Sequence, residues 1–234
     1  MLQITGDFMK KILCMLTSVC LCFLPLVSYA NFSQDDILNH FNDVLENKKI
    51  YFSDISPYPW AEEAILALAD SGIINGVGDG LFMPQNTVSR FEFIKMITGV
   101  CGIVNQNAET PYSDIDKSHW CYSYVASAYE AEMLDIYSQK LLNGAAPITR
   151  EEIAYISVRA MVKAGLIEDG FNVPPSFNDA DKMSEFSPFA ISQLANLGVI
   201  NGRDDGSFGP KDFATRAEAA KIVYNVLNIA ENNF

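Results

Sequence analysis

Apolar residues recur at helical spacing in short stretches of this chain, and polar, glycine-rich segments separate the stretches. Ala61, Ala64, Ile65 and Leu68 follow the i, i+3, i+4, i+7 pattern of a single buried helix face. Gly72 suits the end of that helix, because glycine accepts the left-handed backbone conformation that closes many helices. The pattern predicts short amphipathic helices.

A second apolar stripe follows the glycine-rich segment. It consists of Phe93, Ile94, Ile97 and Val100, and it begins after Ser89-Arg90-Phe91-Glu92. Ser or Thr followed three residues later by Glu is a capping box, which marks a helix start. The unit is therefore predicted to be helix, loop, helix, with at most a turn or a very short strand in the loop.

The capping pattern occurs three times, and each time an Arg occupies the first helical position. The capping residues are Ser89 with Glu92, Thr149 with Glu152, and Thr215 with Glu218, and the arginines are Arg90, Arg150 and Arg216. The positive end of the helix dipole disfavours a cation there by about 0.3 to 1 kcal/mol. Three such placements suggest a bound anion, and the planar guanidinium suits a carboxylate. The capping residues themselves are assigned to the scaffold.

These patterns belong to an internal repeat with three copies, at residues 51–104, 112–164 and 177–230. The first and second copies align at an offset of 60, which places Asp54 on Asp114 and Trp60 on Trp120. The third follows the first at an offset of 126, with Phe186 in place of the Trp. Such regular spacing is typical of repeat architectures, in which each unit packs on its neighbours.

The second copy departs from the others in its loop. Gln139-Lys140 stands where the first copy has Asp79-Gly80, Ile136 replaces Gly76, and Glu132 replaces Gly72. Side chains restrict the backbone where glycine does not. The second loop is therefore predicted to be built differently, and a site that depends on it is expected to be weakest there.

The first thirty residues have the pattern of a secretory signal. Lys10 and Lys11 precede the apolar stretch 12–27, and Ser28-Tyr29-Ala30 forms a small-x-small cleavage site. The apolar stretch is too short to favour a membrane span, so none is expected in the mature chain. An uncleaved anchor is the alternative. Residues 31–50 form a lead segment, in which 34–45 is a candidate short helix.

The net charge indicates which class of partner to exclude, and the cysteine positions indicate whether a disulfide is expected. The formal net charge is −13, which argues against nucleic acid as a partner. Three of the five cysteines lie in the first thirty residues. The remaining two, Cys101 and Cys121, align with ordinary apolar and small residues of the other copies. Free thiols are expected, with a disulfide as the alternative.

The repeat resembles the S-layer homology repeat. The first copy carries the resemblance in Phe52-x-Asp54, Trp60-Ala61, Gly72-Ile73-Ile74-Asn75-Gly76, Asp79-Gly80-x-Phe82-x-Pro84 and Ser89-Arg90-x-Glu92. Three copies cover nearly all of residues 51–230. The resemblance implies an all-α fold of three tandem helix-loop-helix repeats, packed as a pseudo-threefold spindle around a shared core with grooves between repeats.

The resemblance also implies a function. Domains of this family attach exported proteins noncovalently to the bacterial envelope, commonly by binding a secondary cell wall polysaccharide that is linked to peptidoglycan and bears pyruvate. A noncatalytic, secreted protein associated with the cell wall or S-layer is expected. The family's critical basic residue maps to Arg90, Arg150 and Arg216; Arg150 is expected to contribute least, because the second copy lacks the glycine loop.

Two alternatives stay open beside this function. The repeats could act through contacts with other exported surface proteins, as a structural or assembly protein. A wall-glycan hydrolase is the other alternative, since two carboxylates suffice for that chemistry, although nothing in the spacing singles out a pair.

The remaining candidate residues have two interpretations each. Trp60 and Trp120 could stack on a sugar, but packing is favoured because Phe186 replaces them in the third copy. Asp54, Asp114 and Asp179 are interpreted as turn or cap residues, with a hydrogen bond to a ligand as the lesser alternative.

No cofactor and no metal is expected. His40 and His119 are far apart, and the chain contains no nucleophile elbow and no phosphate loop. The acidic glycine loops lack the ligand spacing of a calcium-binding EF-hand, since the third position counted from Asn201 is Arg203.

Overall fold

The computed structural model describes residues 51–138, 140–168, 170 and 177–232. Within these ranges the chain forms six α-helices and one 3-10 helix: α3 Pro59–Asp70, α4 Arg90–Val100, α5 Tyr122–Glu130, α6 Arg150–Lys163, η1 Ala180–Lys182, α7 Pro188–Asn196 and α8 Arg216–Asn232. Extended pairing in these ranges is limited to isolated bridges. The all-α prediction is confirmed. The signal and the lead segment lie outside the described residues.

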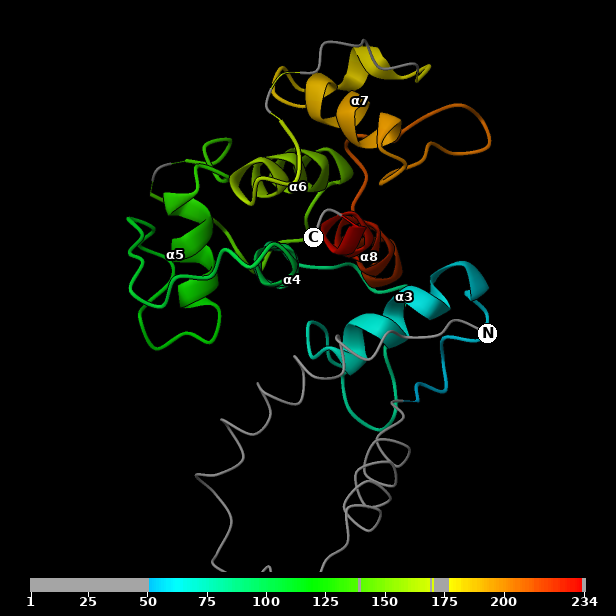
Figure 1. The fold of residues 1–234 in the computed structure, drawn as a ribbon, viewed down its shortest axis with the longest axis horizontal. Coiled ribbons are helices and arrows are strands. Elements are labelled where there is room, and N and C mark those ends of the chain that lie inside the picture. Colours follow the sequence, from blue (N-terminus) through cyan, green and yellow to red (C-terminus); the bar gives the residue numbers. More distant parts are fainter. Residues whose placement is uncertain (1–50, 139, 169, 171–176, 233–234) are drawn as a thin grey trace, which may run out of the picture. The chain divides into compact units, whose positions relative to one another are not determined.

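Each repeat contributes one central and one outer helix (Figure 1). The central helices are α4, α6 and α8. Each outer helix packs against the central helix of the preceding repeat: α5 against α4, α7 against α6, and α3 against α8. The last of these contacts joins the first repeat to the third, so the three repeats close into a ring.

A ring of three backbone hydrogen bonds lies where the repeats meet. The Val88 N–H donates to the Ala214 carbonyl, the Ala214 N–H to the Ile148 carbonyl, and the Ile148 N–H to the Val88 carbonyl, each at 3.1 Å. All three residues are fully buried. A buried peptide group without a partner is costly, so no repeat satisfies this backbone segment by itself.

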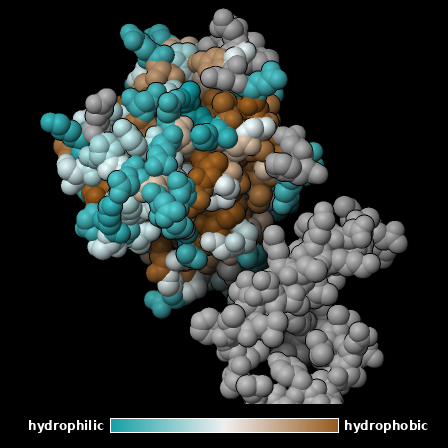
Figure 2. All heavy atoms as spheres, turned by 60° about the vertical axis from the view of Figure 1, so that its left-hand side comes forward, coloured by the Kyte–Doolittle hydropathy of each residue, from teal (hydrophilic) through white to brown (hydrophobic). Residues whose placement is uncertain are grey.

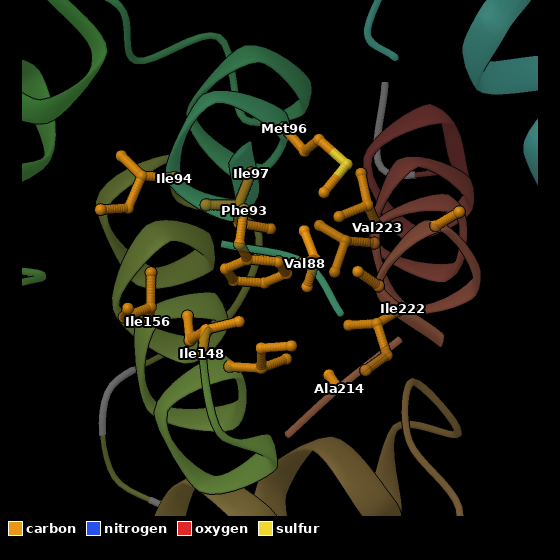
Figure 3. Close-up of a cluster of buried hydrophobic side chains, with 14 of the residues drawn as sticks. Val88, Phe93, Ile94, Met96, Ile97, Ile148, Ile156, Ala214, Ile222 and Val223 are labelled. Carbon is orange, nitrogen blue, oxygen red and sulfur yellow. The ribbon is translucent and has the colours of Figure 1, made fainter. Parts of the chain in front are cut away.

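The shared core surrounds this ring. Side chains from all three central helices meet there, among them Phe93 of α4, Ile156 of α6 and Val223 of α8 (Figure 3). Each of these three is 0% exposed. An amphipathic helix pair has too little apolar surface to enclose such a core alone, which is why the units depend on one another.

The predicted helix starts are confirmed. In α4 the Ser89 hydroxyl accepts the Glu92 N–H at 3.3 Å, and Glu92 Oε2 accepts the Ser89 N–H at 2.8 Å. Thr149 with Glu152 and Thr215 with Glu218 form the same reciprocal pairs. In each repeat the Arg is therefore the first helical residue.

The second loop differs from the others only in part. Glu132 has φ +56°, in the same left-handed region as Gly72 and Gly198, so the outer helix ends in the same way in every repeat. The prediction of a different turn was wrong at this position. Farther along, Val77 donates to the Leu81 carbonyl in the first repeat, whereas Tyr137 donates to Leu134 in the second. In this part of the loop the second repeat is therefore built differently from the first, as predicted.

Both cysteines among the described residues are free thiols, as predicted. Cys121 is buried, and its Sγ lies 3.3 Å from the Phe91 carbonyl. Cys101 is half-buried. Burial raises the pKa of each thiol to about 12.

Candidate functional site

Each motif Arg forms an ion pair with the motif Glu of another repeat. The three pairs are Arg90 Nη2 with Glu152 Oε1 at 2.7 Å, Arg150 Nη1 with Glu218 Oε1 at 2.8 Å, and Arg216 Nη1 with Glu92 Oε1 at 2.9 Å. The other carboxylate oxygen of each Glu accepts the amide that begins its own helix. One Glu thus caps a helix and neutralises an Arg from a neighbouring repeat.

This arrangement corrects the expectation that each Arg is left free for an external anion. The anion beside each Arg is a protein carboxylate. The rest of the Arg216 guanidinium is also engaged: Nε donates to the Phe82 carbonyl at 3.0 Å and Nη2 to the Asn75 carbonyl at 2.9 Å. The group lies over the Phe82 ring, 4.6 Å from its centre. Arg216 therefore holds the loop of the first repeat in place.

The loop that surrounds each Arg belongs to a different repeat from the Arg itself. Arg150 donates to the carbonyls of Phe208 and Asn201, in the glycine loop of the third repeat. Arg90 donates to the Leu142 carbonyl and lies over the Tyr137 ring, in the altered second loop. The expectation that Arg150 lacks the glycine loop was wrong, because the loops are shared around the ring. Arg90 is the one that meets the altered loop.

A groove of about 390 Å³ lies beside Arg216, and it is called the Arg216 groove below. All three repeats contribute to it: the loop 73–77 and helix α4 from the first, Trp120 and the α5 residue Tyr124 from the second, and Arg216 from the third. Its volume is within the range of small-ligand sites, about 300 to 1,000 Å³.

Lys95 supplies the groove with a positive charge that no carboxylate of the described residues pairs with. Its Nζ donates to the Ile73 carbonyl at 3.0 Å, and it has no ion pair with the part of the chain that the structure describes. Lys95 was not among the site residues predicted from the sequence. The available signal was its recurrence as Lys221 at the offset of 126, with Tyr155 in the second repeat. Lys221 likewise has no carboxylate partner within the described ranges.

Both tryptophans are exposed, which contradicts the preference for packing. Trp60 is 50% exposed and Trp120 is 56% exposed. Trp120 lines the Arg216 groove and contacts the Phe91 ring edge-on, with 6.4 Å between ring centres. Trp60 lies in the first turn of α3, and Trp120 lies two residues before α5, so about half of each side chain faces solvent near the start of an outer helix. Stacking on a sugar stays a prediction.

The three aspartates clamp loops. Asp54 accepts the N–H groups of Phe82 and Met83 at 2.9 and 2.7 Å. Asp114 and Asp179 make the corresponding bonds to the second and third loops, through Leu142 with Asn143 and Phe208 with Gly209. The amides that they bind therefore lie in the loops. The cap interpretation required amides at a helix start, so it was wrong. Contact with a ligand is not needed to explain them.

Repeat symmetry distinguishes the surroundings of the three arginines. Since α3 packs on α8 as α5 packs on α4, the repeat symmetry makes Trp60 and Lys221 the counterparts, for Arg150, of Trp120 and Lys95 in the Arg216 groove. Beside Arg90 the corresponding residues are Phe186 and Tyr155. These two rings pack edge to face, with 5.4 Å between their centres. The Arg90 position therefore lacks both the lysine and the tryptophan.

The described surface mixes hydrophobic and hydrophilic side chains, and Figure 2 shows one face on which a brown apolar region lies between teal polar regions. None of the helices in the described ranges is both long enough and apolar enough to span a membrane.

The fold and groove together define a closed three-repeat module with a ligand-sized groove between its repeats. The family model of the S-layer homology domain matches residues 51–94, 111–154 and 176–220. The chain belongs to this family.

Curated relatives align over much of the chain. An exoglucanase, XynX, of Acetivibrio thermocellus is 33% identical over 185 residues, which is 79% of this chain and 17% of the relative. A cellulosome-anchoring protein of the same species is 26% identical over 154 residues, 64% of this chain and 34% of the relative. S-layer protein EA1 of Bacillus anthracis is 26% identical over 173 residues, 74% of this chain and 19% of the relative.

The chain spans only a small part of the relatives it matches. It aligns with 10% of an amylopullulanase of Thermoanaerobacterium thermosulfurigenes and with 18% of an endoglucanase of a Bacillus species. What it shares with these enzymes is the matched segment, so their activities do not transfer to it.

Proposed function

We propose that this protein is a noncatalytic, secreted module of the bacterial cell surface that binds an anionic secondary cell wall polysaccharide. The binding attaches the protein noncovalently to the envelope. Membership of the S-layer homology family and the alignments with an anchoring protein and an S-layer protein support an anchoring role. The observation that carries the proposal is Lys95, which has no ion pair within the described ranges, together with the exposed Trp120 in the Arg216 groove.

The groove residues have separate roles in this proposal. Trp120 offers a ring face to a sugar. Lys95 binds a carboxylate of the polymer, such as that of a pyruvate substituent, because it carries the free positive charge. Arg216 is already paired with Glu92, so it fixes the loop carbonyls around the ligand. A net charge of −13 repels an anionic polymer at long range. Binding therefore depends on this local cation.

Two of the three motif-arginine positions are proposed to bind the polysaccharide. One is the Arg216 groove, and the other is the corresponding position of Arg150 with Lys221 and Trp60. The Arg90 position is proposed to be the weakest, because Tyr155 and Phe186 replace the lysine and the tryptophan there.

Cosedimentation with purified wall sacculi tests the proposal, before and after the polysaccharide has been removed. Intact sacculi should retain the protein, and equal retention by stripped sacculi would refute the proposal. The double variant Lys95→Ala, Lys221→Ala should bind intact sacculi about a hundredfold more weakly, at about tenfold for each lost charge contact. The matched control is Lys163→Ala, Lys182→Ala, which removes the same charge from exposed positions outside the groove.

A further inference from the structure

A second cavity, of about 450 Å³, lies in the second repeat and shares no residue with the Arg216 groove. It is called the tyrosine pocket below. Three tyrosines and three carboxylates line it, together with Leu134: Tyr112, Tyr129, Tyr137, Glu130, Glu132 and Asp135. It lies between Tyr112, which precedes α5 in the chain, the end of α5 and the following loop.

The pocket is formed by residues that distinguish the second repeat from its neighbours. Tyr129, Glu132 and Asp135 stand where both other repeats have Ala, Gly and Asn, which are Ala69, Gly72 and Asn75 in the first and Ala195, Gly198 and Asn201 in the third. Alanine and glycine at these positions cannot supply an aromatic wall and a carboxylate. The pocket therefore depends on several coordinated departures from the repeat pattern.

The aromatic wall is fixed and accessible. The Tyr112 hydroxyl donates to the Leu134 carbonyl at 3.2 Å, which anchors this buried ring. Tyr129 packs on it edge to face, with 5.8 Å between ring centres, and remains 39% exposed. An exposed tyrosine face can stack on the flat face of a sugar ring and can also attract a cation.

The carboxylates give the pocket a negative charge. Asp135 accepts the Tyr155 hydroxyl at 2.8 Å, and Glu130 accepts the Glu109 N–H at 3.2 Å. Neither Asp135 nor Glu130 has an ion pair with any residue in the described ranges, whereas Glu132 pairs with Arg159 at 3.3 Å. An ionised carboxylate accepts several hydrogen bonds, so each has acceptor capacity left for a ligand.

A metal ion does not fit this lining. The described residues contain no group of three or more His, Cys, Asp and Glu side chains placed to hold one. An organic cation can use both kinds of lining group, because carboxylates accept hydrogen bonds from an ammonium group and tyrosine faces attract a cation. The volume of about 450 Å³ leaves room for more than an ammonium group alone.

We propose that the tyrosine pocket binds a sugar unit that carries a free ammonium group, as in a de-N-acetylated hexosamine. The Tyr129 face stacks on the sugar ring, while Asp135 and Glu130 accept hydrogen bonds from the ammonium and hydroxyl groups. The pocket thus selects a positive charge, whereas the Arg216 groove is proposed to select a negative one.

The test compares the β-1,4-linked disaccharide of glucosamine with its N-acetylated counterpart, each titrated into the isotope-labelled protein and followed by NMR. The glucosamine disaccharide should shift amide signals of residues 129–137 and bind at least about tenfold more tightly, because acetylation removes the charge. Tyr129→Ala and Asp135→Asn should each weaken binding by about tenfold. Both variants restore the residue of the other two repeats, so the fold should tolerate them.

Asp70→Asn is the matched control, because Asp70 ends α3 as Glu130 ends α5 and its loss changes the net charge equally. It should leave binding unchanged, and so should Lys95→Ala with Lys221→Ala, which separates this proposal from wall binding through the grooves. Equal affinity for both disaccharides would overturn the proposal. Unchanged affinity in Tyr129→Ala would overturn it too, as would equally tight binding of free lysine.

Discussion

Arg216 and Glu92 are 124 positions apart in the sequence, yet their side chains lie 2.9 Å apart. This pair joins the third repeat to the first. With the Arg90–Glu152 and Arg150–Glu218 pairs it forms a closed set of three ion pairs, in which every repeat supplies one cation and one anion. In an open repeat array the terminal units lack one neighbour, whereas each repeat here contacts both others.

We predict that the three ion pairs contribute unequally to stability. The Arg90–Glu152 pair is the most enclosed, with side chains 18% and 11% exposed, whereas Glu92 is 38% exposed. Glu152→Gln should lower the free energy of unfolding by about 3 kcal/mol, and Glu92→Gln by about 1 kcal/mol. Glutamine still completes a capping box, so the comparison isolates the charge. Urea denaturation measures both, and equal losses would contradict the prediction.

A second prediction concerns Phe91, which stands where the third repeat has Ala217, and Gly144, which stands where the other two repeats have Pro84 and Pro210. The Phe91 ring covers Gly144 so closely that a Cβ atom there would overlap it. Gly144→Ala should therefore destabilise the protein by about 2 kcal/mol through overpacking.

The double variant Phe91→Ala, Gly144→Ala tests whether the two departures compensate each other. Its loss of stability should be smaller than the sum of the single losses by about 1 kcal/mol or more, because the shorter side chain removes the clash. Additive losses in chemical denaturation would show that the two positions are independent.

The third prediction is a dependence on pH that passes through Glu151. Burial would raise the pKa of this carboxyl, but hydrogen bonds from Lys211, Ser184 and Ser187 outweigh burial and lower it below its ordinary value of 4.5. The stabilisation is therefore complete above about pH 4.5 and is lost as the pH falls through the lower pKa of the folded state.

Glu151→Gln should accordingly be less stable at neutral pH and should lose less stability than the parent protein between about pH 5 and pH 3. Denaturation curves recorded across this range give both quantities. Parallel profiles for the two proteins would exclude Glu151 as the source of the effect.

The fourth prediction concerns the thiols. Because burial raises the pKa of Cys101 and Cys121 to about 12, almost no thiolate is present at neutral pH. A thiol-specific colour reagent should react slowly with these two residues in the folded protein and rapidly after unfolding in urea without reductant. If they gave no thiol signal after unfolding, they would have to be oxidised.

The sequence predicted the features that depend on short-range rules. The apolar stripe of α4, the Ser89–Glu92 cap and the placement of Arg90 all follow from spacings of three or four residues. The hydrogen-bond partners of the arginines could not be predicted in this way, because they belong to other repeats. Ring closure places Arg150 beside Asn201 and Phe208 of the third repeat.

Two further features of the site also depend on contacts that short-range sequence rules do not predict. Asp54 clamps amides 28 and 29 positions away, a distance at which no helix-capping rule applies. The exposure of Trp60 and Trp120 depends on how the outer helices sit against their neighbours, which their own sequence does not reveal.

The ring formed by Val88, Ile148 and Ala214 also limits how such a module can grow. Each of the three amides already has its carbonyl partner within the ring, so a fourth repeat would find no open end to join, and a missing repeat would leave a gap. The number of inter-repeat positions is therefore fixed at three. A protein built on this plan can increase its valency only by adding another complete ring.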